Sequence, residues 1–80
     1  MENRSRQGRQ RTLKTGKIIF NHHASVVDCT VRNMSETGAC LHLHSVAGIP
    51  QEFDLMIDGV RRACTVKWRT PSRIGIAFPH

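Results

Sequence analysis

Apolar and polar residues alternate in short runs along most of the chain. On both sides of residues 33–38, the string NMSETG, every second residue is apolar. These residues are Val27, Cys29 and Val31 before the string, and Ala39, Leu41 and Leu43 after it. A period of two is typical of strands that bury one face, and the string itself is rich in turn-forming residues. We therefore predict two strands that meet at residues 33–38.

The same alternation, interrupted by turn residues, predicts six strands in all. They cover residues 17–20, 24–32, 39–44, 52–58, 60–69 and 74–78. Asp58-Gly59 joins two alternating runs and predicts a type I′ hairpin, since that turn needs a positive φ at both central residues. No window long enough for a helix shows a 3.6-residue period. The predicted fold is all-β, a small six-stranded antiparallel β-barrel, because closure removes the edges of so small a sheet.

The predicted strand at residues 60–69 carries the chain's single tryptophan. Alternation places Trp68 on the face of Cys64 and Val66, which predicts a core position. A platform on which a base stacks is the alternative role for this indole. The opposite face is cationic, and we interpret it as a solvated surface or as part of a positively charged one. Its charged residues are Arg61, Lys67 and Arg69.

The length indicates one small domain, and the cysteines indicate a reducing compartment. A chain of 80 residues makes a single domain with one core. It has no apolar run of about 18 residues and no signal peptide, so we expect neither a membrane span nor export. Its three cysteines are an odd number within strand patterns, which predicts reduced thiols. We therefore expect a cytoplasmic protein.

The net charge of +6 is concentrated near the N-terminus. Residues 1–17 contain six basic residues and one acidic residue, which gives +5, whereas residues 18–80 contain six basic and five acidic residues, which gives +1. Low hydrophobicity together with this charge predicts a flexible basic arm over residues 1–14, followed by the barrel over residues 15–80. Such an arm attracts polyanions of any kind.

Three stretches of the chain resemble the PilZ domain family. NMSETG fits the family pattern Asn/Asp, any, Ser, any, any, Gly, and an arginine-rich segment precedes it. The runs CTVKWR and RIGIAF are similar to the family's last two strands, so the resemblance extends from Arg4 to Phe78. It implies a PilZ-like split barrel that binds the bacterial second messenger cyclic di-GMP, with no other cofactor. Many PilZ domains continue into a C-terminal helix, and we expect none here.

The resemblance also implies a binding site. In PilZ proteins, paired arginines of the arm fold over the nucleotide, while the Asn/Asp, Ser and Gly of the turn contact it from the barrel. The family spacing is Arg, three residues, Arg, and RSRQGRQR at residues 4–11 contains no such pair. Arg9 matches the second arginine, and Ser5 stands in the place of the first. The implied ligand-binding residues are Arg4, Arg6, Arg9, Arg11, Asn33, Ser35 and Gly38. The alternative for the turn is that its polar groups satisfy only their own backbone.

Metal and catalytic patterns are weak. Cys40, His42 and His44 share one face of a predicted strand, a spacing that zinc can use, but no fourth ligand is evident, so we predict no metal site. These histidines can instead line the ligand face. The chain shows no Ser/His/Asp order, no paired carboxylates and no phosphate-binding glycine loop. We therefore expect that the protein is not an enzyme.

Three functions fit these patterns. The first is a cyclic di-GMP receptor that signals by ordering its arm over the nucleotide and so changing the surface offered to an unidentified protein partner. The second is a PilZ-like protein-interaction module that does not bind the nucleotide, which the altered arginine spacing favours. The third, a small barrel that binds nucleic acid, rests on the positive charge. Only four aromatic residues and no tyrosine speak against it.

Overall fold

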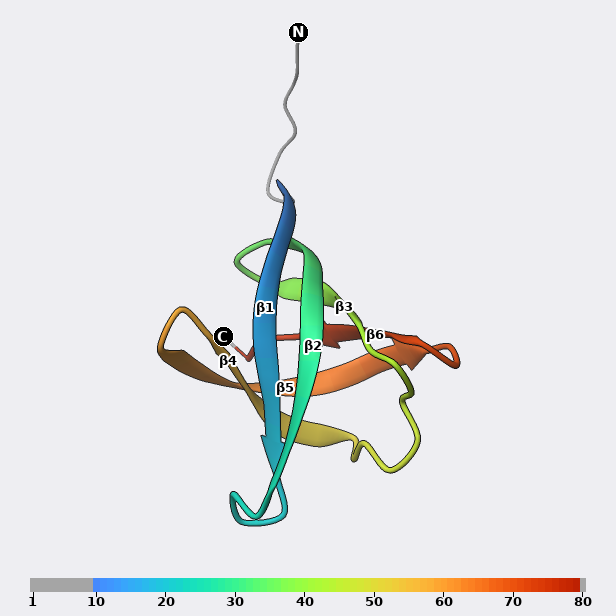
Figure 1. The fold of residues 1–80 in the computed structure, drawn as a ribbon. Helices are drawn as coiled ribbons and strands as arrows, with labels where there is room; N and C mark the ends of the chain where they lie inside the picture. The colour runs from blue at the N-terminus through green and yellow to red at the C-terminus, as the bar shows by residue number, and fades with distance from the viewer. Residues whose placement is uncertain (1–9, 80) are drawn as a thin grey trace, which may run out of the picture.

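The computed structural model describes residues 10–79, and these residues form six strands and no helix. The strands are β1 (Gln10–Phe20), β2 (Ser25–Met34), β3 (Gly38–His42), β4 (Glu52–Ile57), β5 (Val60–Arg69) and β6 (Arg73–Ala77). Every neighbouring pair is antiparallel, and the strands close a barrel in the order β1-β2-β3-β6-β5-β4 (Figure 1). This confirms the predicted fold class. In the described range there is no helix long and apolar enough to cross a membrane.

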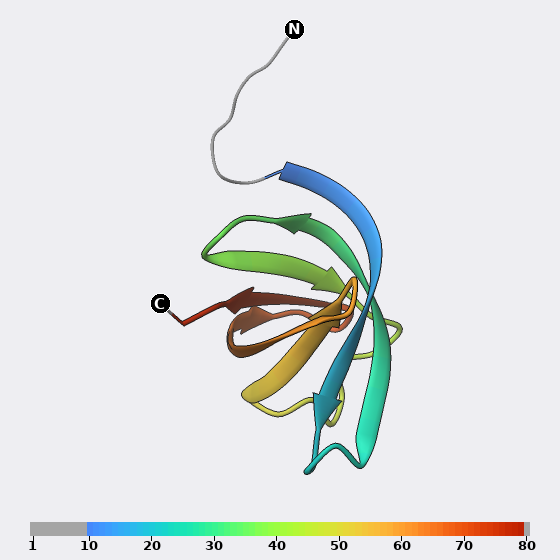
Figure 2. The same ribbon diagram turned by 90° about the vertical axis from the view of Figure 1, so that its left-hand side faces the viewer.

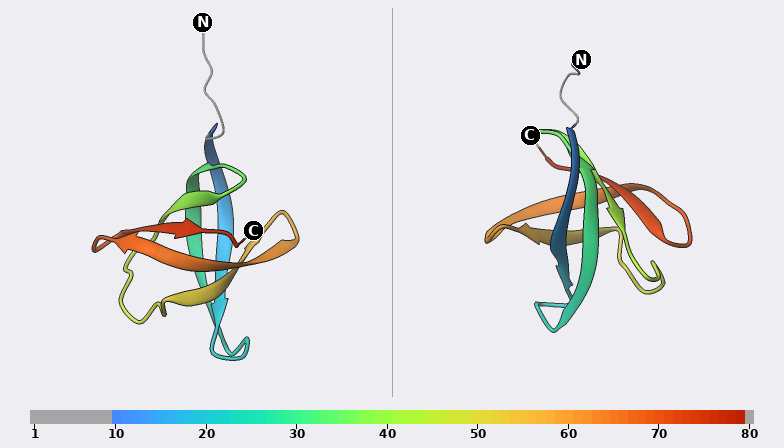
Figure 3. Two further views of the ribbon diagram at one scale, coloured as in Figure 1. Left: turned by 180° about the vertical axis from the view of Figure 1, so that it is seen from behind. Right: turned by 45° about the horizontal axis from the view of Figure 1, so that its top comes forward.

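Two hairpins shape the barrel. β1 and β2 form a long, strongly curved hairpin (Figure 2), and β5 and β6 cross it, passing in front of it in the view from behind (Figure 3, left). The hairpin of β4 and β5 turns at Asp58 and Gly59, whose φ angles are 54° and 78°. Both values are positive, as the predicted type I′ turn requires.

The core lies between these layers and contains no charged or polar side chain among residues 13–79. Its fully buried side chains come from five of the six strands: Ile18, Val31, Leu41, Leu55 and Ile74. Four of them occupy apolar positions of the alternating pattern, and Ile18 lies in the apolar run 18–20, so burial of strand faces stabilises the barrel.

β1 is longer than predicted, since it begins at Gln10 and not at residue 17. Residues 10–14, which we assigned to the arm, therefore belong to this strand, and Gln10, Arg11 and Lys14 pair with β2 on either side of a bulge. Alternation did not reveal this part of the strand because Lys14 and Thr15 are exposed and no apolar side chain here faces the core. Backbone hydrogen bonds, and not burial, hold it in the sheet. Residues 1–9 of the predicted arm lie outside the described residues.

The predicted core position of Trp68 is wrong. Val66 pairs with Ile76 and Trp68 pairs with Gly75, so Lys67 is an extra residue in β5 at a β-bulge. One extra residue turns the following side chain to the opposite face of the strand. Trp68 therefore lies on the outside of the barrel, where 48% of it is exposed.

Candidate functional site

The turn between β2 and β3 closes on itself through Ser35. The backbone N–H of Ser35 donates to the carbonyl of Gly38 over 2.8 Å. The Ser35 hydroxyl in turn accepts hydrogen bonds from the backbone N–H groups of Thr37 and Gly38, at 3.2 and 3.3 Å. This confirms that Ser35 caps backbone groups of the turn. The same hydroxyl donates to the Gly38 carbonyl at 3.4 Å and lies 3.2 Å from the Thr37 hydroxyl, so its hydrogen-bonding capacity is used within the turn.

Gly38 is needed for a close approach, but the approaching group belongs to the barrel. Its φ is not among the positive values, which occur in Gly48 and Gly59 among the described glycines. A Cβ atom at Gly38 would collide with the carbonyl oxygen of Ile76 on β6. Glycine therefore lets β3 and β6 pair closely at this point. A role of Gly38 toward a ligand stays a prediction.

Two further hydrogen bonds anchor the middle of the turn. The backbone N–H of Phe78 donates to the carbonyl of Thr37 at 2.8 Å, and the Arg62 guanidinium donates to the carbonyl of Glu36 at 3.4 Å. Arg62 also lies over the Phe78 ring, 3.7 Å from its centroid, which is a cation–π contact. Arg62 was not among the predicted site residues, because nothing in the sequence reveals that the start of β5 lies beside this turn.

Five residues, one from each of five adjacent strands, are paired in turn across the sheet, and from Asn33 onward they lie on the outside of the barrel. We call them the outer row: Arg11 on β1, Asn33 on β2, Cys40 on β3, Gly75 on β6 and Trp68 on β5. Cys40 marks the outward face, because its neighbours Ala39 and Leu41 are buried in the core. Adjacent strands lie about 4.8 Å apart. The row thus places the candidate turn residue Asn33 on the same surface as the tryptophan.

The indole of Trp68 forms one end of this row. It occupies the space in which a side chain at Gly75 would stand, so it lies directly on the β6 backbone. Gly75 is buried beneath it, whereas about half of Trp68 is exposed. The indole is thereby held in place on one side and open on the other. Such an arrangement suits stacking of a planar ring.

A second line of exposed side chains runs beside the outer row. Thr30 pairs with His42, and His42 pairs with Arg73, so these residues face outward next to Cys40 and Gly75. His42 thus shares the outward face of Cys40, as the alternation predicted. Within residues 10–79 no three His, Cys, Asp or Glu side chains are placed so that they could hold a metal ion.

The arginine-rich segment enters the barrel next to the turn. Arg11 pairs with Asn33, and Gln10 pairs with Met34, so the beginning of β1 runs beside the first residues of NMSETG. Asn33 is half-buried and makes polar interactions of its own. The structure gives the backbone position of Arg11, while Arg4, Arg6 and Arg9 fall outside the described residues. The contribution of these four side chains stays a prediction.

The cations of β5 that we considered for a positive surface are mostly engaged elsewhere. Arg61 forms an ion pair with Asp54 at 2.9 Å. Arg69 donates to the carbonyl of Ile49 at 2.8 Å and so holds the loop between β3 and β4. Lys67 remains exposed at the bulge. These two arginines therefore stabilise the barrel and do not form a free cationic face.

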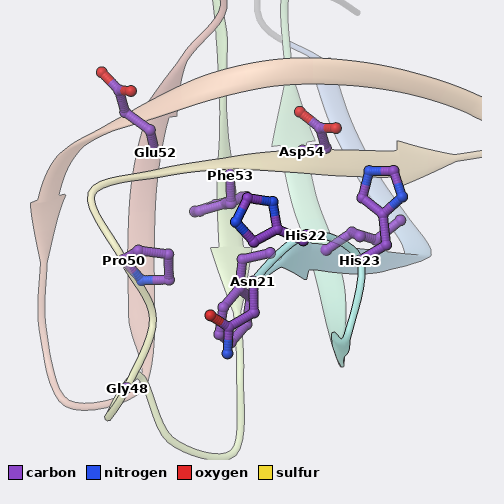
Figure 4. Close-up of a pocket in the computed structure, with 10 residues that line it drawn as sticks. Asn21, His22, His23, Gly48, Pro50, Glu52, Phe53 and Asp54 are labelled. Carbon is purple, nitrogen blue, oxygen red and sulfur yellow. The ribbon is translucent and has the colours of Figure 1, made fainter.

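The barrel also has a pocket remote from the turn, at the opposite end of the β1–β2 hairpin. It has a volume of about 490 Å³, and its lining includes His22, His23, Glu52 and Asp54. Figure 4 shows the Glu52 and Asp54 carboxylates pointing away from the His22 ring, which accounts for the lack of a metal cluster there. None of the predicted site residues lines this pocket. We therefore place the candidate site at the outer row and the 33–38 turn.

Comparisons with known proteins agree with this architecture. The family model described as PilZ domain matches residues 3–80. Among solved structures, the chain is similar to one titled "Crystal structure of PilZ domain of CeSA from cellulose synthesizing bacterium", with a TM-score of 0.68 and 12% sequence identity. The match covers 92% of this chain and 82% of that one, and at this identity it concerns the fold alone. A search of curated proteins finds no significant match.

Proposed function

Because the chain belongs to the PilZ domain family, a family of cyclic di-GMP receptors, we propose that it binds cyclic di-GMP on the outer row and the 33–38 turn. One observation supports this placement above all others. Arg11 pairs with Asn33, so the segment that carries the arginines joins the barrel beside the family's turn residues. A ligand on the outer row can therefore be reached by the arm and by the turn together.

Each part of the site suits one part of a cyclic dinucleotide. The arm arginines match its two phosphates, since a guanidinium pairs with a phosphate through two parallel hydrogen bonds. Asn33 and Ser35 provide polar groups at the edge of the row. The exposed side of Trp68 offers a stacking surface for a base, worth about 1–3 kcal/mol. Cys40 lies between Asn33 and the indole, which covers Gly75, and its small side chain lets the ligand lie close to the sheet.

Binding would be transmitted through the arm. When arginines of residues 4–11 close over the nucleotide, the surface around the turn changes its shape and its charge. A protein partner that recognises only one of the two surfaces would then respond to the messenger. The partner itself is a protein of unspecified identity, and the mechanism is a transition from a free to a docked arm.

The test is isothermal titration of the whole chain with cyclic di-GMP at about 150 mM salt, where attraction of a polyanion to a basic arm is partly screened. We expect selective binding over GMP and over a short oligonucleotide. Arg9→Ala should weaken binding by about 1.5–3 kcal/mol, the usual effect of losing one charge-assisted hydrogen bond. Asn33→Ala should also weaken it, and Lys67→Ala serves as a control that removes an exposed charge. If Arg9→Ala and Asn33→Ala both bind like the wild type, the proposed site is wrong.

A second candidate is a protein-interaction module that does not bind the nucleotide. Two observations favour it: RSRQGRQR lacks the family's arginine spacing, and an apolar cavity of about 240 Å³ opens beside the turn. Met34, Ile57, Val60 and Phe78 line this cavity, and Val60 is 58% exposed. Failure of the wild-type chain to bind cyclic di-GMP in the same titration would favour this second function.

A further inference from the structure

Arg73 and Trp68 are neighbours on the outer face, at the hairpin that joins β5 and β6. Trp68 pairs with Gly75, and Arg73 lies two residues before Gly75 on the same strand, so both point outward. Residues in this diagonal relation have Cα atoms about 7–8 Å apart, within reach of a long and an aromatic side chain. The Arg73 guanidinium can therefore reach the rim of the indole.

The backbone of Arg73 is held firmly, whereas its side chain is uncommitted. Its N–H donates to the Thr70 hydroxyl at 3.0 Å, and its carbonyl accepts from the Thr70 N–H at 2.9 Å. The side chain is exposed and makes no hydrogen bond or ion pair with residues 13–79, whose side chains the structure describes. Three acidic residues of this range already pair with other cations: Asp28 with Lys17, Asp54 with Arg61, and Asp58 with Lys14. Arg73 thus presents a free guanidinium from a fixed position.

This placement suits recognition of a purine edge. A base stacked on the exposed side of Trp68 lies roughly parallel to the indole, and its edges point sideways across the sheet surface. Arginine recognises guanine through two hydrogen bonds in the plane of the base, to O6 and N7. Adenine has an amino group in place of O6, so it offers a donor where the guanidinium needs an acceptor.

We infer that Arg73 reads the O6 and N7 edge of a guanine stacked on Trp68, and that this pair makes the site prefer guanine to adenine. The inference rests on the proposed function and adds a specificity-determining residue that lies outside both the arm and the 33–38 turn. It assigns guanine recognition to the β5–β6 end of the outer row, away from the end that carries Asn33.

The main competing role for Arg73 is a contact to a phosphate. The two roles differ in a measurable way, because cyclic di-GMP and cyclic di-AMP carry the same phosphates and different bases. A phosphate contact supports both ligands equally, so its loss leaves their affinity ratio unchanged. A contact to the guanine edge supports only cyclic di-GMP, so its loss lowers the ratio.

The experiment is titration of the whole chain, wild type and Arg73→Ala, with cyclic di-GMP and with cyclic di-AMP. We expect Arg73→Ala to lower the affinity ratio by about 5- to 150-fold, the discrimination of one bidentate arginine–base pair. Lys67→Ala is the matched control, since it removes an exposed cation next to Trp68 and should leave the ratio unchanged. In a Trp68→Ala background, Arg73→Ala should have a much smaller effect on the ratio, because the base is no longer held beside it.

The outcomes separate the inference from the proposed function. An unchanged ratio in Arg73→Ala, with or without a uniform loss of affinity, overturns the guanine-reading role and leaves the receptor function standing. A wild-type chain that binds neither dinucleotide overturns the receptor function, and the inference falls with it. A ratio that drops in Arg73→Ala and not in Lys67→Ala supports both.

Discussion

The two sides of the outer row are built in different ways. On the β2–β3 side, Asn33 and Ser35 stand two residues apart, and the turn that follows closes through its own hydrogen bonds. On the β5–β6 side, Trp68 faces outward only because Lys67 is an extra residue in its strand. The closure of the turn on the first side depends on a few neighbouring residues, although Asn33 itself faces outward across a bulge at Arg32. The second depends on the register of the sheet, so a local sequence pattern reveals the first side and conceals the second.

The two sides of the outer row also differ in what packs against their glycines, Gly38 and Gly75. A side chain at Gly38 would meet the backbone of β6, whereas a side chain at Gly75 would meet the indole of Trp68. Backbone in a closed barrel has little freedom to move, and an exposed indole can rotate away. The β2–β3 side should therefore tolerate substitution less well than the β5–β6 side.

The largest effect is expected for Gly38→Ala. The new methyl group would press on the carbonyl oxygen of Ile76, and relief would require separating β3 from β6. We expect the free energy of unfolding to fall by about 3 kcal/mol, the upper end of the usual range for overpacking. Urea denaturation measures it.

Gly48→Ala is the matched control for this prediction. Gly48 has a φ of 82° and open space around its Cα, so alanine there suffers only the strain of a left-handed backbone. That strain is worth about 1–2 kcal/mol. Equal losses in Gly38→Ala and Gly48→Ala would show that the close approach of β6 to Gly38 does not limit substitution.

A smaller effect is expected for Gly75→Ala, because Trp68 can move. We expect the free energy of unfolding to fall by about 1 kcal/mol, and the emission of the single tryptophan to shift to longer wavelength as the indole enters water. The displaced indole should also stack a base less well, so affinity for cyclic di-GMP should fall.

A double-mutant cycle separates the clash from other effects of the new methyl group. In a Trp68→Ala background the indole is gone, so Gly75→Ala should leave the free energy of unfolding nearly unchanged. A loss of the same size in both backgrounds would mean that Trp68 does not lie on Gly75.

Much of the fold is predictable from the sequence because burial of one strand face leaves a period of two. Val31, Leu41 and Leu55 all follow that period and are all buried, and Asp58-Gly59 forms the turn that its sequence predicts. The turn residue Ser35 is predictable for the same local reason. What escaped prediction depends on pairing between strands.

Three features of the candidate site depend on such pairing. The bulge at Lys67 turns Trp68 to the opposite face of β5, and the amino-acid composition of the strand gives no sign of the bulge. The beginning of β1 is a strand through its hydrogen bonds with β2, without an apolar face to mark it. Arg62 reaches the turn from a strand that begins more than twenty residues later in the chain. None of these three features can be recognised from the periodic pattern of apolar residues in the sequence.

Alkylation of the three cysteines tests the outer row, and its expected effect is the smallest. Cys40 lies on the outer row, whereas Cys29 and Cys64 lie in the core. Burial raises the pKa of Cys29 to about 11 and that of Cys64 to about 12, whereas Cys40 is half-buried on the row itself. Only the thiolate reacts with iodoacetamide. At pH 8 we therefore expect one alkyl group per folded chain, on Cys40, and three in urea, with mass spectrometry as the measurement.

Raising the pH removes the stability that the two buried thiols contribute to the barrel. In the unfolded chain the thiols ionise near an ordinary pKa of about 8.5, while in the barrel Cys29 and Cys64 stay protonated until about pH 11 or 12. The unfolded state then binds fewer protons, so the stability that these thiols contribute is complete below about pH 8.5 and is lost as the pH rises toward their folded values. Labelling of Cys29 and Cys64 should begin only where that loss opens the barrel.

Cyclic di-GMP should slow the alkylation of Cys40 at pH 8 several-fold, since a ligand that extends from Trp68 to Asn33 covers the thiol between them. Cys40→Ser, which leaves no reactive thiol in the folded chain, identifies the labelled position. Nucleotide that binds without protecting Cys40 would place the ligand away from the outer row. Protection that Trp68→Ala and Asn33→Ala each weaken and Lys67→Ala preserves would show that the two differently built sides of the row hold one ligand between them.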